Sequence, residues 1–228
     1  MTALNHENLL RAALRNNDPN AQQILDQWIK SAKDRQLLHH TLEGLLIEAA
    51  DTNIPTMVEM LVKHIDPKLR ESTPLYVAAS KGHLDCVKIL LPLSDPLVNK
   101  GDIYSIAIEK NQLDCLAVLL PAPSGMIATR VALTAVHLKN EDALDLILQH
   151  PSIPQDLSLA LAEAVKEECW SMVEKLFPRA DPQLTLEEMH KRDMHNAQEL
   201  ERRIALSQRQ TIAAQLENTN PPKAPRKI

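Results

Sequence analysis

The chain has 228 residues, a formal net charge of −5, and an apolar fraction of 44% that includes only one Phe, two Trp and two Tyr. We therefore expect an aliphatic core, and the mixed charges give no field suited to a nucleic-acid backbone. Only four glycines accompany 15 prolines, which argues against a sheet protein with tight hairpins and against glycine-rich nucleotide-binding loops. No apolar run approaches the roughly 20 residues of a membrane-spanning helix.

The first predicted element pair spans residues 9–29. Its first helix begins with apolar Leu9, Leu10 and Ala13 among polar neighbours, as expected of a terminal unit with one solvated face. Its second helix carries Leu25 followed by the pair Trp28/Ile29. This apolar triplet is the first of a series.

Two sets of apolar residues recur along the chain at nearly constant intervals. The triplet steps by 33, 29, 29, 28 and 29 residues, and an alanine set steps by 29, 29, 28 and 29 in phase with it. A period of 20 to 50 residues indicates a solenoid. The triplets after the first begin at Val58, Val87, Leu116, Leu144 and Val173, and the alanines are Ala49, Ala78, Ala107, Ala135 and Ala164.

The clearest unit is residues 73–91. Its apolar residues lie at helical spacing on both sides of Gly82, so we predict a helical hairpin with Gly82 in the turn. Pro74 suits the first turn of the first helix, and Thr73 is expected to cap it through its hydroxyl.

The segment Thr73-Pro74-Leu75-Tyr76-Val77-Ala78 resembles the T-P-L-H-x-A signature of the ankyrin repeat. The resemblance covers roughly residues 5–180 and implies an all-α, ankyrin-like solenoid of about six helix-hairpin repeats. Most periods are about four residues shorter than a standard unit of 33, so we expect the β-turn fingers to be trimmed to short loops. Tyr76 stands where the family usually has a histidine that bonds neighbouring loops.

The turns between the paired helices also recur. Gly and Asn tolerate the left-handed conformation that such a helix end requires. Lys139 and Glu168 depart from this preference, so their units are either degenerate or shifted by one residue, with Asn140 replacing Lys139. The turn positions are Asn53, Gly82, Asn111, Lys139 and Glu168.

The segment 184–217 contains no proline or glycine and is rich in Glu, Gln, Arg and Ala, which favours one long helix. Its apolar stripe is too intermittent for a strong coiled coil. The helix either caps the last repeat or pairs in trans, as an oligomer contact or with a partner helix. We divide the chain into a repeat array (1–182), a C-terminal helix (183–217) and a disordered tail (218–228).

Three cysteines, Cys86, Cys115 and Cys169, and no secretory leader suggest a reducing, cytoplasmic setting. Cys86 and Cys115 share one slot of adjacent units and are interpreted as small core residues. The nine histidines show no ligand spacing. We expect no catalytic residue, no cofactor and no metal, and predict that the protein is not an enzyme.

The resemblance also implies that the first helices line a concave surface that binds a partner protein. Val77, Ile106 and Leu138 predict an apolar strip on that surface, with Lys81 and Lys110 beside it. The alternative is that Val77 and Ile106 are partly buried by neighbouring helices. The predicted partner-binding residues are Tyr76, Val77, Ser80, Lys81, Ile106, Glu109, Lys110, Thr134, His137 and Leu138; equivalent positions flank them at Glu48, Asp51 and Thr52 and at Glu163, Lys166 and Glu167.

The sequence thus predicts a protein-protein interaction module with no membrane insertion and no nucleic-acid partner. Degenerate ankyrin proteins of this type also resemble effectors that intracellular bacteria deliver into host cells. Two alternatives remain open. The chain is an enzyme or a regulatory subunit with a site between the concave face and the C-terminal helix, or a structural protein that self-assembles through that helix.

Overall fold

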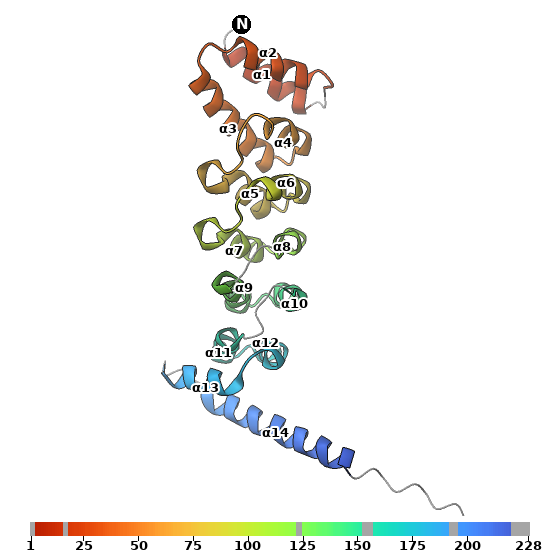
Figure 1. Ribbon diagram of the computed structural model, residues 1–228, viewed down its shortest axis with the longest axis vertical. Helices are drawn as coiled ribbons and strands as arrows, with labels where there is room; N and C mark the ends of the chain where they lie inside the picture. Colours follow the sequence, from red (N-terminus) through yellow and green to blue (C-terminus); the bar gives the residue numbers. More distant parts are fainter. Residues whose placement is uncertain (1–2, 16–17, 122–124, 152–156, 192–195, 220–228) are drawn as a thin grey trace, which may run out of the picture. The chain divides into compact units, whose positions relative to one another are not determined.

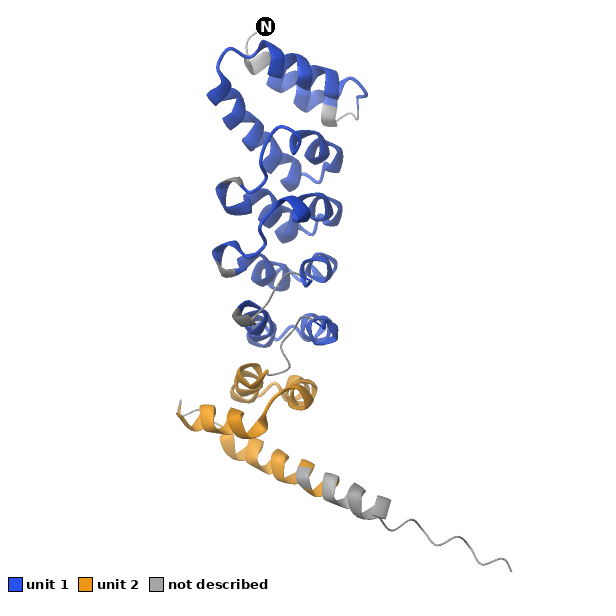
Figure 2. Ribbon diagram, viewed as in Figure 1, with its two compact units in different colours: residues 1–153 blue, residues 154–228 orange. Residues whose placement is uncertain are grey.

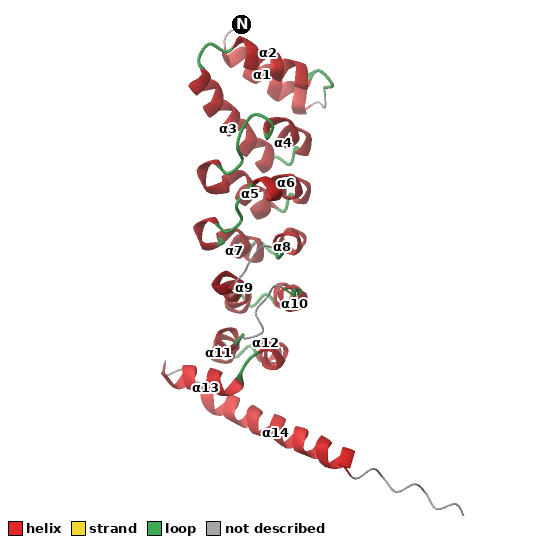
Figure 3. Ribbon diagram, viewed as in Figure 1, coloured by secondary structure: helices red, strands yellow, loops and turns green. Residues whose placement is uncertain are grey.

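The computed structural model describes residues 3–15, 18–121, 125–151, 157–191 and 196–219. Figure 3 shows helices and loops throughout these ranges, and no strand occurs within them. The all-α fold class is confirmed. Contacts group the chain into two compact units, Met1–Ile153 and Pro154–Ile228 (Figure 2). The division at residues 182 and 217 stays a prediction.

The first unit contains five helical hairpins among its described residues (Figure 1). From the second hairpin onward, each first helix packs on the next first helix, and each second helix on the next second helix. These four hairpins therefore form one stack. The pairs are α1 (Ala3–Arg15) with α2 (Ala21–Ser31), α3 (Arg35–Asp51) with α4 (Pro55–Leu61), α5 (Leu69–Lys81) with α6 (Leu84–Leu90), α7 (Asp102–Glu109) with α8 (Leu113–Leu119), and α9 (Gly125–His137) with α10 (Glu141–Gln149).

The recurrent apolar residues occupy equivalent slots of this stack. Val58, Val87, Leu116 and Leu144 lie in successive second helices, and each is fully buried. The alanines of the first helices, from Ala49 to Ala135, are also fully buried. A side chain larger than alanine there would hold the neighbouring first helices apart, because protein interiors are close-packed. The periodicity therefore encodes the packing between repeats.

All five predicted turn residues have positive φ, with values of 56° at Asn53, 75° at Gly82, 54° at Asn111, 53° at Lys139 and 57° at Glu168. Lys139 and Glu168 thus keep the register of the other turns, and the shift by one residue is wrong. A side chain with a Cβ is strained in this conformation by roughly 1–2 kcal/mol. The packing of the flanking helices outweighs that strain.

Short loops and 3-10 turns connect the hairpins, in agreement with trimmed fingers. Arg70, Glu71 and Ser72 are all left-handed, so the regular part of α5 begins at Thr73. The predicted capping role of Thr73 is wrong, because Thr73 is itself the first regular residue of the helix after the left-handed turn, and its hydroxyl donates to the Arg70 carbonyl. The buried Ser72 hydroxyl instead accepts from the Asp95 amide at 3.0 Å. The 3-10 turns are η1 (Leu91–Leu93), η2 (Val98–Lys100) and η3 (Phe177–Arg179).

The second unit contains α11 (Ser158–Lys166), α12 (Trp170–Leu176), α13 (Pro182–Lys191) and α14 (Ala197–Thr219). A long C-terminal helix is present as α14, but the prediction of one helix from residue 184 is wrong. Asn196 precedes α14 with a φ of 68°, 28 residues after the Glu168 turn, and its side-chain amide donates to Glu168 Oε1 at 3.1 Å.

The pair α13 and α14 is therefore a further repeat. Leu200 and Ile204 follow the Asn196 turn at the same distances at which Met172 and Leu176 follow the Glu168 turn, and all four are buried. Helix α13 packs against both α11 and α14, so its placement matches that of a first helix.

Arg203 fixes α14 against α12. Its guanidinium carbon lies 4.6 Å from the centroid of the Trp170 ring, and its Nη1 lies 3.6 Å from Glu174 Oε1. Residues 220–228, most of the predicted disordered tail, lie outside the described residues. Of the helices that the structure describes, none combines the length and the apolar character needed to cross a bilayer.

Candidate functional site

Eight of the ten predicted partner-binding residues lie on the neighbouring first helices α5, α7 and α9, and the other two, Lys110 and Leu138, directly follow α7 and α9. We call this set the first-helix surface. Tyr76 and Leu138 are its most exposed apolar side chains, with 39% and 42% of their area accessible. Val77 and Ile106 are half-buried, which agrees with the alternative that neighbouring helices cover them in part. Lys81, Glu109, Lys110 and His137 are exposed, and Ser80 and Thr134 are half-buried.

The charged groups of this surface are paired with each other or with the preceding repeat. Lys81 Nζ lies 3.3 Å from Asp51 Oδ1, and Lys110 Nζ lies 2.9 Å from Glu109 Oε1. The hydrogen bond and the charge of Glu109 raise the pKa of Lys110 above its ordinary value. Because these pairs are exposed, they add little stability, and they can exchange for charged groups of a partner.

The two hydroxyls of the surface are satisfied by their own helices. Ser80 donates to the Val77 carbonyl at 2.8 Å, and Thr134 donates to the Arg130 carbonyl at 2.9 Å. These bonds hold both side chains against the helix. They leave Tyr76, Leu138 and the charged groups as the parts that project.

A cavity of about 400 Å³ lies beside Tyr76, between the left-handed start of α5 and the connector that leads into α7. We call it the loop notch. Burial raises the pKa of the Tyr104 hydroxyl, and the carboxylate of Asp95, which lines the notch, raises it further. The notch is lined by Arg70, Glu71, Ser72, Thr73, Tyr76, Asp95, Pro96, Val98, Asn99, Asp102 and Ile103.

Glu71 and Asp102 of the notch stand in no sequence pattern that would have marked them. Asp95 does, because Asp66, Asp95 and Asp181 each precede a proline. Each of these carboxylates accepts the amide of the residue two positions on, at 2.9–3.0 Å. Asp18 also precedes a proline and accepts the Asn20 amide at 2.8 Å, but it lies between α1 and α2 of one hairpin. The Asp-Pro step therefore marks a turn between two helices, and at Asp95 it places a carboxylate in the notch.

A second cavity, of about 600 Å³, lies between the first hairpin and α3. His6 of α1 stacks on Trp28 of α2 at the edge of this cavity, with ring centroids 6.4 Å apart. Arg11 joins the first hairpin to α3, since its Nη2 lies 2.9 Å from Glu48 Oε2. The cavity indicates that the terminal hairpin packs less closely on its neighbour than the central repeats do.

The buried cysteines are poor nucleophiles. Burial, with a smaller contribution from Asp85, raises the pKa of Cys86 to about 11. Burial and Asp114 do the same for Cys115. Because the thiolate is the reactive form, a raised pKa leaves these thiols inert near neutral pH. Their role as small core residues is supported by this environment.

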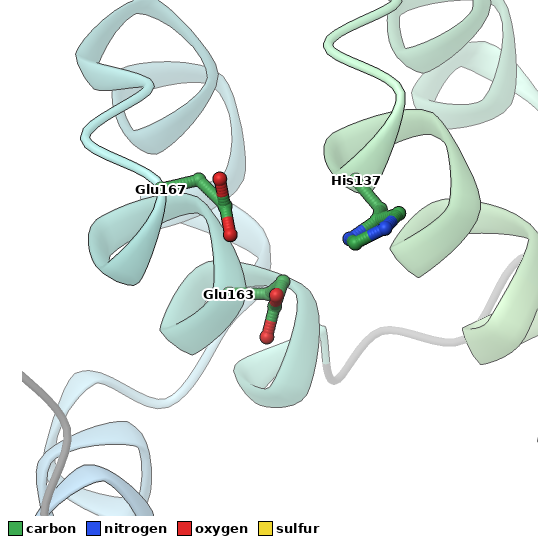
Figure 4. Close-up of side chains that lie close together, drawn as sticks. All are labelled: His137, Glu163 and Glu167. Atoms are coloured by element: carbon green, nitrogen blue, oxygen red, sulfur yellow. The ribbon is translucent and has the colours of Figure 1, made fainter.

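In the second unit, Glu163 of α11 and Glu167, which directly follows that helix, lie one turn apart on the same side, as Figure 4 shows. They flank one ammonium group, since Lys166 Nζ lies 2.7 Å from Glu163 Oε1 and 3.7 Å from Glu167 Oε1. These contacts raise the pKa of Lys166 above its ordinary value, and the hydrogen bond that Lys166 donates to Glu163 has the largest effect. His137, which Figure 4 also labels, ends α9 in the first unit.

The comparison with protein families agrees with this architecture. A model of three consecutive ankyrin repeats matches the chain in two overlapping placements, residues 9–102 and 46–130. Together the placements span more than half of the chain, from the first hairpin into α9. A search of curated proteins finds no match. From the stacked hairpins, the left-handed turns and this match, we conclude that the chain belongs to the ankyrin repeat family.

Proposed function

We propose that the protein binds a partner protein through the first-helix surface. Ankyrin repeats are generally protein-protein interaction modules, and repeat proteins bind along the face that their stacked helices present. The observation that carries the proposal is the exposure of Tyr76 and Leu138 on that face. Both lie among lysine and glutamate side chains that can form the rim of an interface.

Tyr76 is the expected anchor of this interface. The chain has two tyrosines, of which Tyr104 is fully buried and Tyr76 is 39% exposed. Tyrosine gives a large, rigid contact area with a polar end, and it is enriched among the residues that dominate binding energy. Leu138 adds an exposed apolar group two repeats further along the stack.

Affinity purification with a matched pair of variants tests the proposal. The double variant Tyr76→Ala/Leu138→Asp removes the two exposed apolar groups of the first-helix surface. The control Lys88→Ala/Ala117→Asp likewise introduces one alanine and one aspartate, at exposed positions of α6 and α8. Both variants are first compared with the wild type by circular dichroism and thermal unfolding, so that loss of binding is separated from loss of fold.

A partner that binds wild type and control but is reduced at least tenfold with Tyr76→Ala/Leu138→Asp supports the proposal, because truncation of one interface anchor costs 2 kcal/mol or more. The proposal is refuted if the partners remain bound to Tyr76→Ala/Leu138→Asp. Equal losses with both variants also contradict the assignment to this surface.

The cellular setting forms a second part of the proposal. We propose that the protein acts in a reducing, cytoplasmic compartment as an effector delivered by an intracellular bacterium. The buried, unpaired Cys86 and Cys115 support the reducing compartment, and the resemblance to effector ankyrin proteins motivates the delivery. A fusion to a reporter that is active only in host cytosol, expressed in the source organism during infection, tests delivery. Signal restricted to the source cell excludes it.

A further inference from the structure

The loop notch carries more negative than positive groups. Its lining contains one arginine and the three carboxylates of Glu71, Asp95 and Asp102. The arginine is directed to the preceding repeat, since Arg70 Nη2 lies 3.2 Å from His40 Nδ1 and Arg70 Nε lies 3.5 Å from Glu43 Oε2. Its charge is therefore largely compensated outside the notch.

Hydrogen bonds orient Glu71 and Asp95, whereas Asp102 forms an ion pair. Glu71 Oε2 accepts from the Asn99 side-chain amide at 2.7 Å, and Asp95 Oδ1 accepts from the Leu97 amide at 2.9 Å. Asp102 pairs with Arg130, whose Nη2 lies 3.8 Å from Asp102 Oδ1. Two hydrogen-bonded carboxylates and a third in a long ion pair thus line a cavity whose lining carries a net negative charge, which favours a cation.

Tyr76 adds an aromatic group to the same cavity. The ring is 39% exposed and lines the notch with the carboxylates. A cation above a tyrosine ring is attracted by the ring quadrupole, and guanidinium does so most often among protein cations because it is planar and weakly hydrated. A guanidinium also offers several N–H donors to separate carboxylates.

We propose that the loop notch receives an arginine side chain of the partner protein, with the guanidinium beside Tyr76 and its N–H groups donating to the carboxylates of Glu71 and Asp102. This inference rests on the proposed function, because Tyr76 belongs to both the notch and the first-helix surface. A partner seated on that surface passes the mouth of the notch. The notch then selects for a basic residue at one position of the partner.

Nuclear magnetic resonance titration of the full chain with N-acetyl-arginine amide tests the chemistry. The uncharged ends of this probe isolate the side chain, and N-acetyl-citrulline amide is its neutral counterpart. We expect saturable amide shifts at residues 71, 76, 95, 99 and 102 with the arginine probe, weakened by added salt, and at least fivefold weaker binding of the citrulline probe. Shifts that are absent, scattered over other acidic sites or equal for both probes overturn the inference.

The variant Glu71→Gln/Asp102→Asn removes two charges, while the new amide oxygen at position 71 can still accept from Asn99. We expect it to weaken binding of N-acetyl-arginine amide about fivefold, since each exposed charge pair contributes modestly. The control Asp85→Asn removes an exposed carboxylate of α6 and should leave binding unchanged. A fivefold loss with the control, or none with the double variant, contradicts the inference.

Partner capture separates this inference from the proposed function. If the same partner is captured less by Glu71→Gln/Asp102→Asn and by Tyr76→Ala/Leu138→Asp, the notch inference and the proposed function are both supported. If capture depends on Tyr76 and Leu138 but not on the carboxylates, the notch inference fails and the proposed function remains. If the arginine probe binds but no partner depends on either surface, the notch is a site for a small organic cation, and both proposals are wrong.

Discussion

Two substitutions at equivalent turn positions are expected to change stability in opposite directions. Gly82 has a φ of 75°, and an added Cβ would stand 2.1 Å from Gln112 Oε1. The left-handed conformation costs a residue with a Cβ roughly 1–2 kcal/mol, and alanine recovers about 0.4–1 kcal/mol by restricting the unfolded chain. Gly82→Ala should therefore lower the free energy of unfolding by about 1 kcal/mol, with the flexible Gln112 side chain moving aside.

Lys139 already carries this strain, at a φ of 53°. Asparagine visits the left-handed region more readily than lysine, so Lys139→Asn should raise the free energy of unfolding by about 0.5 kcal/mol. Urea titration followed by circular dichroism measures both changes. Their opposite signs are the test: if Gly82→Ala stabilises or Lys139→Asn destabilises the protein, the two turns do not share the backbone conformation that their common register requires.

Four further outcomes follow. Leu116→Ala empties a fully buried slot and should lower the free energy of unfolding by about 2–5 kcal/mol in urea titration, whereas an effect below 1 kcal/mol would contradict the packing. Burial raises the pKa of Cys86 from 9.0 to about 11, so between about pH 9 and 11 the native state retains a thiol proton that the unfolded chain loses. The urea midpoint of unfolding should therefore fall as the pH rises through this window. A constant midpoint would argue against burial of the thiol. Arg203→Ala should destabilise the second unit by about 1 kcal/mol and alter Trp170 fluorescence, and an unchanged emission spectrum would exclude the stacking. Removal of residues 208–228 should leave the midpoint of thermal unfolding unchanged, whereas removal of residues 184–228 should lower it. Equal effects of the two deletions would show that α13 and the start of α14 do not complete a repeat. A dimer in solution that is lost when residues 208–228 are removed would reveal self-assembly through the C-terminal helix.

The stack of repeats was predictable because it rests on apolar residues at a fixed interval. Val87 and Leu116 occupy the same slot of adjacent second helices, and the period alone predicts this. The turn at Gly82 was equally predictable, since only a few residue types tolerate positive φ. The register at Lys139 was not, because lysine carries no preference for that conformation and the surrounding packing imposes it.

The break before α14 was missed because helix propensity is a weak guide where no proline or glycine interrupts a segment. Asn196 was the available signal, at 28 residues from Glu168. The capping role assigned to Thr73 was wrong because three consecutive left-handed residues precede it, and sequence patterns do not reveal such a turn. The first-helix surface followed from the repeat register, but the loop notch lies on connectors that have no helical period.

The four hairpins from α3 and α4 to α9 and α10 form one stack, in which each repeat packs on the next. Nuclear Overhauser contacts between labelled methyl groups test this most directly. The structure predicts cross-peaks between helix α4 and α6 methyls at Val58 and Val87, and between Val87 and Leu116 of α8, with none between Val58 and Leu116. Cross-peaks that join Val58 to Leu116, or their absence between neighbouring repeats, would contradict it.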